Sequence, residues 1–134
     1  MRVGYVCAHP VQLDLIRQRT PPWIVSRLGQ RAAVAALDSG AYYQRRYAET
    51  HRIRQRLVAF LTGCGFDVVP GACANFVMCR PPPGIAAQAV QAACARCNVY
   101  IRLVDEGTLR LAVVAPDSLP RMQGAIEAAL ALTR

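Results

Sequence analysis

The chain has 134 residues, of which 54% are hydrophobic, and it carries a net charge of +8. This length corresponds to one domain with a real core, and the apolar content excludes a disordered chain. No apolar run reaches the roughly 18 residues that a membrane-spanning helix requires. The N-terminal stretch also lacks the apolar length of a signal peptide, so we expect a cytoplasmic protein.

All 16 basic residues are arginines, and the chain contains no lysine. Its side chains therefore cannot form a Schiff base with a carbonyl compound, because that reaction takes an amine. A basic surplus is compatible with nucleic acid or with anionic ligands. The arginines are spread along the whole chain, however, and this favours a general bias in composition over a nucleic-acid surface.

The first predicted element is a short, mostly apolar strand over Arg2–Ala8. Val11–Arg19 is compatible with one or two helical turns. The next segment, Thr20–Ser26, contains two consecutive prolines, which the interior of a helix does not accept. We expect an extended connector there, anchored by the side chain of Trp23.

Two helices are predicted to follow the connector. Ser26 is a suitable N-cap for a helix over Arg27–Leu37, and Ala41–Gly63 is the longest predicted helix. The longer helix combines aromatic residues with several arginines, a combination that can bind nucleic acid. Its apolar residues nevertheless keep helical spacing toward one core, so we interpret the arginines as a solvated face. These arginines are Arg45, Arg46, Arg52, Arg54 and Arg56.

From Phe66 onward the pattern alternates between strands and helices. The fold class is therefore α/β, with helices packed on one side of a small sheet of three to four strands. The predicted elements are strands over Phe66–Val69 and Asn75–Arg80, a helix over Ile85–Cys97, strands over Val99–Val104 and Thr108–Val114, and a final helix from Asp117 or Ser118 through Leu132.

The last two predicted strands flank the turn-forming residues 105–107, Asp-Glu-Gly. If they pair as a three-residue hairpin, Arg102 lies opposite Arg110, and both side chains project from the same face. Like charges directly opposite one another destabilise a strand pair. The arginine pair therefore suggests an anion between the two guanidinium groups. Two alternatives stay open: that both arginines belong to a solvated face, and that the two strands do not pair as a hairpin at all.

Six cysteines raise the question of a metal site. Cys94 and Cys97 have C-x-x-C spacing, but a structural zinc site needs four ligands, usually as two such pairs. The sequence offers neither a second pair nor two histidines at helical spacing. We therefore expect no metal.

Five short motifs occur in a characteristic order: Arg2-Val3-Gly4-Tyr5, Pro21-Pro22-Trp23-Ile24-Val25-Ser26, Pro70 followed by Ala74-Asn75-Phe76, Tyr100-Ile101-Arg102, and Leu109-Arg110-Leu111. Together they cover essentially the whole chain. The series resembles the C-terminal small domain of class I/II (fold-type I) pyridoxal-phosphate aminotransferases. The likeness is strongest to the histidinol-phosphate aminotransferase branch, with threonine-phosphate decarboxylase as a near relative.

The resemblance implies roles for three arginines. Arg2 occupies the position that holds the phosphate of the cofactor, pyridoxal 5'-phosphate. Arg110 matches the arginine that grips the anionic end of the substrate, and Arg102 matches one that faces the substrate phosphate in the histidinol-phosphate branch. The substrate would be a small-molecule amino donor or acceptor with an anionic group, and complete relatives are homodimers. Residues 1–25 would be a remnant of the large cofactor-binding domain plus a connector, and residues 26–134 the small domain.

The family's catalytic lysine has no counterpart in this chain. We therefore expect the chain to contribute substrate recognition to amino-group transfer and to be inactive alone. Two alternatives stay open. One is a stand-alone basic module that binds nucleic acid or an acidic partner, and the other is a pseudoenzyme subunit that completes a separately encoded large domain.

Overall fold

The computed structural model describes residues 3–133, which fall into two compact units. The boundary between the units, at Arg45 and Arg46, lies within helix α3 (Gly40–Gly63). The sequence predicts a different division, in which residues 1–25 derive from the large domain and residues 26–134 form the small domain. The two compact units do not test this division by origin, so it stays a prediction. None of the helices in the described part of the chain has the length and apolar character needed to cross a membrane.

The first unit contains two complete helices, α1 (Pro10–Gln18) and α2 (Arg27–Asp38). Helix α1 begins with a proline, at a position where the missing N–H would have no intrahelical partner. Helix α2 begins after Ser26, whose hydroxyl accepts a hydrogen bond from the Gly29 N–H at 3.1 Å. The predicted cap at Ser26 is therefore confirmed.

Two predictions for this unit are wrong. Residues 3–8, the described part of the first predicted strand, form no strand. A strand requires a hydrogen-bonded neighbour, and none of the described residues supplies one there. Trp23 does not anchor the connector either, because its side chain is 95% exposed and its backbone is left-handed, with φ of 57°. The connector therefore presents its large apolar ring outward.

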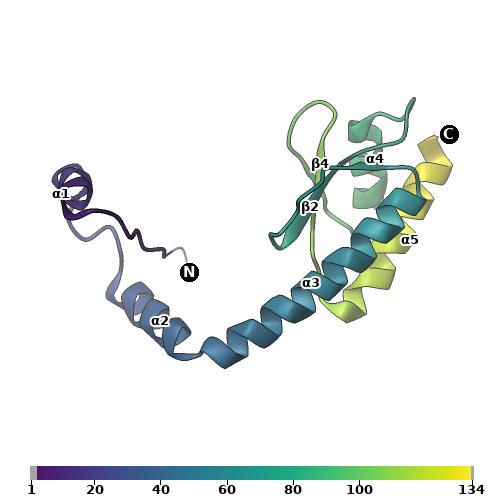
Figure 1. Cartoon of the computed structure of the whole chain (residues 1–134). Coiled ribbons are helices and arrows are strands. Elements are labelled where there is room, and N and C mark those ends of the chain that lie inside the picture. The colour runs from purple at the N-terminus through teal and green to yellow at the C-terminus, as the bar shows by residue number, and fades with distance from the viewer. Residues whose placement is uncertain (1–2, 134) are drawn as a thin grey trace. The chain divides into compact units, whose positions relative to one another are not determined.

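The second unit is an antiparallel sheet with helices on one face, as the sequence predicts (Figure 1). The strand order is β1-β2-β4-β3, and the two C-terminal helices pack against each other. The strands are shorter than predicted because hydrogen-bonded pairing covers only part of each extended segment. The elements that follow α3 are β1 (Asp67–Val68), β2 (Phe76–Arg80), α4 (Ala87–Arg96), β3 (Arg102–Leu103), β4 (Leu109–Ala112), the 3-10 helix η1 (Pro116–Ser118) and α5 (Leu119–Thr133).

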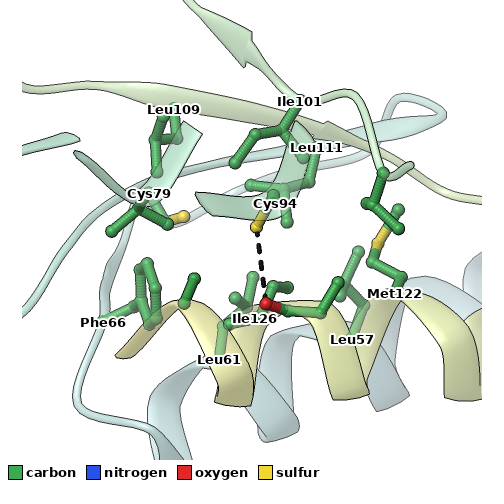
Figure 2. Close-up of a cluster of buried hydrophobic side chains, with 14 of the residues drawn as sticks. Leu57, Leu61, Phe66, Cys79, Cys94, Ile101, Leu109, Leu111, Met122 and Ile126 are labelled. Carbon is green, nitrogen blue, oxygen red and sulfur yellow. Dashed lines mark hydrogen bonds between the residues drawn. The ribbon is translucent and has the colours of Figure 1, made fainter. Parts of the chain in front are cut away.

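The core lies between the inner face of the sheet and the helices (Figure 2). Alternate residues of β2 and β4 point inward, since side chains along a strand alternate between its two faces. On the helical side, Leu57 and Leu61 of α3 are fully buried, as is Ile126 of α5. The inward-pointing residues of the two central strands are Val77, Cys79, Leu109 and Leu111.

Two cysteines belong to this core rather than to a reactive site. Burial raises the pKa of Cys79 to about 12 and that of Cys94 to about 11. Both therefore remain protonated thiols at neutral pH, and the Cys94 thiol donates to the Ala125 carbonyl at 3.7 Å (Figure 2). None of the six cysteines is in a disulfide. Residues 3–133 contain no cluster of three histidine, cysteine or acidic side chains placed to hold a metal ion.

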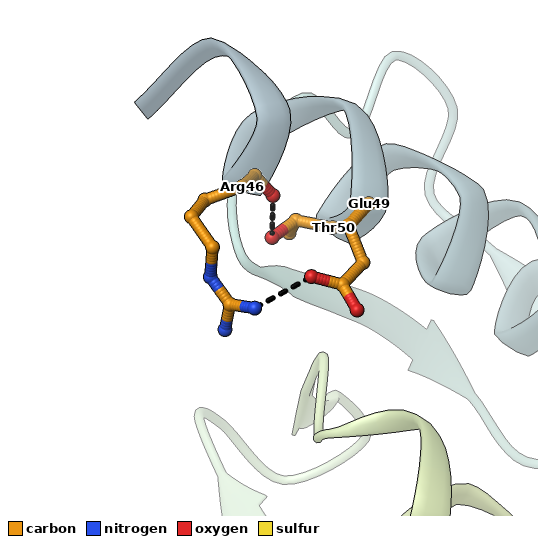
Figure 3. Close-up of polar contacts among 3 residues, drawn as sticks. All are labelled: Arg46, Glu49 and Thr50. Carbon is orange, nitrogen blue, oxygen red and sulfur yellow. Dashed lines mark hydrogen bonds and ion pairs between the residues drawn. The ribbon is translucent and has the colours of Figure 1, made fainter. Parts of the chain in front are cut away.

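The arginines of α3 do not form one solvated face. Arg46 pairs with Glu49 at 2.6 Å, and the Thr50 hydroxyl donates to the Arg46 carbonyl at 2.8 Å (Figure 3). Arg54, by contrast, is only 8% exposed. The interpretation as a solvated face is therefore wrong for Arg54, and it agrees with the exposure of the other four, Arg45, Arg46, Arg52 and Arg56.

The turn between β3 and β4 is closed by Asp105. Its carboxylate accepts hydrogen bonds from the N–H groups of Gly107 at 2.9 Å and Thr108 at 2.7 Å. These bonds, the one from Gly107 first, hold the pKa of Asp105 below its usual value. The Val104 N–H then donates to the Thr108 carbonyl at 2.8 Å, which fixes the register of the hairpin.

Replacing Asp105 with alanine is expected to lower thermal stability at neutral pH, and the difference should shrink in acid. Because the folded state lowers the pKa of this carboxyl, its contribution is fully present above the unfolded pKa of about 4. It is lost as the pH falls through the lower pKa of the folded state. Thermal unfolding of both proteins between about pH 7 and pH 2 measures the effect. Asp105→Asn, which keeps an acceptor without the charge, is the control, and a difference independent of pH would contradict the assignment.

Candidate anion-binding site

The outer face of the sheet, opposite the helices, carries the arginine pair. Arg110 of β4 lies opposite Arg102 of β3 and, on its other side, opposite Met78 of β2. The predicted hairpin register is therefore confirmed, with Arg102 directly facing Arg110 along the backbone. Arg102 is exposed and Arg110 is half-buried, so both guanidinium groups are within reach of a solute.

A third arginine on this face, Arg80, has an acidic partner in the described part of the chain, unlike Arg102 and Arg110. Arg80 of β2 lies opposite Asp67 of β1, and their side chains form an ion pair at 3.3 Å. Neither Arg102 nor Arg110 has a carboxylate partner among residues 3–133. Two arginines at opposite backbone positions thus lack a carboxylate partner among residues 3–133, whereas their neighbour Arg80 has one. Such a pair is suited to an anion, because guanidinium groups bind carboxylate and phosphate oxygens with paired hydrogen bonds.

The guanidinium of Arg110 lies over the ring of Phe76, 4.1 Å from its centroid. Phe76 belongs to β2, on the opposite side of β4 from Arg102. The contact is a cation–π interaction, which attracts the cation to the face of the ring. The sequence motif that contains Phe76 did not predict this contact. The contact could have been predicted only from the pairing of β2 with β4, because this pairing places Phe76 diagonally next to Arg110.

Arg54 fixes the segment that leads into Phe76. Its guanidinium donates to the carbonyls of Cys73 at 3.1 Å and Ala74 at 2.8 Å. A second terminal nitrogen lies 2.6 Å from Nδ1 of His51, which acts as the acceptor if the histidine proton is on Nε2. A buried guanidinium with three such partners is satisfied without a carboxylate.

Two hollows of this unit are lined by residues other than the arginine pair. A groove of about 650 Å³ runs between α3 and the segment 66–72, with His51 and Arg54 in its lining. A smaller pocket of about 220 Å³ lies beneath the loop 69–74, and Phe76 and Met78 form part of its wall. Phe76 thus contacts both this pocket and the guanidinium of Arg110.

Replacing Arg54 with methionine is expected to lower the free energy of unfolding by about 1–3 kcal/mol, because two carbonyls then lose their charged donor. Arg56→Met, an exposed position on the same helix, is the matched control and should change stability by less than about 0.5 kcal/mol. Urea unfolding of the two variants and the wild type makes the comparison. Equal effects of the two substitutions would show that the hydrogen bonds of Arg54 do not stabilise the loop.

The described residues thus include an α/β unit whose outer sheet face carries two arginines without a carboxylate partner among residues 3–133. The family model described as "Aminotransferase class I and II" matches residues 1–128. The chain therefore belongs to the class I and II aminotransferase family, and the recognition made from its motifs is confirmed.

Individual relatives agree with this family. The chain is 33% identical over 117 residues to the aromatic amino acid aminotransferase of Thermobifida fusca, which covers 87% of this chain and 32% of that protein. It is 35% identical over 85 residues to the histidinol-phosphate aminotransferase of Aromatoleum aromaticum, and this match covers 61% of this chain and 24% of that protein. A decarboxylase from Sulfurospirillum multivorans shares the fold, with a TM-score of 0.76 at 19% identity over 92% of this chain and 37% of that one. The chain spans about a third of the length of the curated relatives it matches.

Enzymes of this family use pyridoxal 5'-phosphate. The cofactor supplies the electron sink for amino-group transfer and is anchored through a lysine amine. No residue of this chain is a lysine, and Arg2, the residue expected to hold the cofactor phosphate, lies outside the described residues. The described residues by themselves therefore do not fit the cofactor, and no step of its chemistry is assigned to them.

Proposed function

We propose that this chain is the substrate-recognition portion of a pyridoxal-phosphate-dependent aminotransferase similar to histidinol-phosphate aminotransferase. The observation that carries the proposal is the pair Arg102 and Arg110, which face each other without a carboxylate partner among residues 3–133. Amino-transfer substrates carry an anionic group, and the pair offers such a group two guanidinium forks from one side. Family membership supports the reaction class. The roles of the two arginines come from the resemblance, and their opposite positions on β3 and β4 support them.

In this proposal Arg110 grips the anionic end of a small-molecule amino donor or acceptor. Arg102, on the neighbouring strand, adds a second set of donors to the same anion. A phosphate accepts hydrogen bonds from both guanidinium groups more readily than a carboxylate does, because it presents more oxygens. The complete enzyme would be a cytoplasmic homodimer that includes a large cofactor-binding domain.

The chain alone is proposed to be catalytically inactive. Proton movement at the substrate requires a general base positioned at the reacting carbon, and the family's lysine supplies it. The arginines remain protonated at physiological pH and cannot take that role. Binding and orienting the anion is the contribution that remains.

Replacing Arg110 with methionine is expected to weaken the binding of inorganic phosphate by about tenfold or more, since a charge-assisted donor pair is lost. Arg102→Met should weaken it by several-fold. Arg80→Met is the matched control: it removes an arginine from the same face, but one that is already paired with Asp67. NMR titration with phosphate at low salt measures the three dissociation constants. Equal weakening by all three variants would indicate general attraction to a basic surface and contradict a defined site.

Mixing the chain with pyridoxal phosphate, L-phenylalanine and 2-oxoglutarate is expected to give no amino transfer beyond that of the cofactor alone. The physical reason is the absence of any lysine among its 134 residues. Formation of glutamate, followed by mass spectrometry, is the measurement, and the Arg102→Met/Arg110→Met double variant is the control. A saturable rate that the double variant abolishes would contradict inactivity of the isolated chain.

A further inference from the structure

We propose that Phe76 is a positioning residue that holds the guanidinium of Arg110 in its anion-binding orientation. The inference rests on the proposed function, because it assigns to Phe76 a role in the same anion site. Its structural basis is the stacking of Arg110 on the Phe76 ring at 4.1 Å. A second basis is the order of the strands, which places Phe76 and Arg102 on opposite sides of Arg110.

Arg110 experiences repulsion from one neighbour and attraction from the other. Arg102 is directly opposite on β3, and a like charge at that position drives the guanidinium away. The ring of Phe76 on β2 offers the face of a π system, which attracts the same cation. Both effects move the Arg110 side chain in the same direction, toward β2, so the anion-free site has one preferred arrangement.

The stacked arrangement leaves the binding groups of Arg110 available. A guanidinium is planar, and its N–H donors all point outward within that plane. Phe76 contacts the guanidinium at its central carbon, Cζ, whereas an anion binds the N–H groups around it. The ring therefore fixes the orientation of the fork without competing for its donors. An anion that bridges to Arg102 then meets one guanidinium whose orientation is already set, which reduces the entropy lost on binding.

Phe76 is itself held in place by the loop before it. The Arg54 guanidinium donates to the carbonyls of Cys73 and Ala74, three and two residues before Phe76. Met78, two residues after Phe76 on the same face, lies directly opposite Arg110 but has no ring. Met78 therefore serves as the matched position, because it lies on the same face next to Arg110 and has no aromatic ring.

The experiment compares phosphate binding by the full chain with that of Phe76→Leu, Phe76→Tyr and Met78→Leu. Phe76→Leu is expected to raise the dissociation constant about two- to fivefold, the range that corresponds to an exposed cation–π contact. Phe76→Tyr keeps the ring and should restore the wild-type value, and Met78→Leu should leave it unchanged. The second readout is the Arg110 Nε–Hε resonance, whose ring-current shift should be lost in Phe76→Leu and kept in the other two.

The outcomes separate this inference from the proposed function. Unchanged phosphate binding in Phe76→Leu, with binding lost in Arg110→Met, would overturn the positioning role and leave the anion site intact. Equal weakening by Phe76→Leu, Phe76→Tyr and Met78→Leu would show a structural effect of the strand and also overturn it. Absence of phosphate binding by the wild-type chain would overturn both proposals. Thermal unfolding of each variant checks that it is folded under the conditions of the titration.

Discussion

The antiparallel pairing of β4 with both of its neighbours is the constraint on which the second unit depends. Because side chains alternate along a strand, this single register places Leu109 and Leu111 in the core and Arg110 on the opposite face. A shift by one residue would exchange the two sets and bury a guanidinium. The apolar core thus stabilises the register, and the register in turn positions the candidate site.

The candidate site places two like charges opposite each other and holds one of them against an aromatic ring. Two facing arginines destabilise the strand pair, yet no carboxylate of the described chain relieves them, whereas Arg80 nearby is paired with Asp67. The cation–π contact with Phe76 attracts the Arg110 guanidinium toward β2 and offsets part of this cost. The buried Arg54 holds the loop before Phe76 in place by donating to two of its backbone carbonyls.

The first unit has a different character, since most of its large apolar side chains are exposed. Helix α1 buries no residue, and α2 buries only Gly29. The connector leaves Trp23 almost fully in solvent. The predicted strand at the start of the chain requires a hydrogen-bonded neighbour that the described residues do not provide, so its described part, residues 3–8, remains without regular structure.

The sequence by itself determined the helices, the strands of the hairpin and the opposition of Arg102 and Arg110. These follow from local signals: the Ser26 cap, the alternation of apolar residues and the three-residue turn at Asp105. Only the tertiary structure decided that β2 lies beside β4, that Phe76 stacks on Arg110, and that Arg54 is buried rather than solvated. Each of these features depends on contacts between residues more than a dozen positions apart. Local periodicity cannot specify such contacts, because they depend on how whole elements pack.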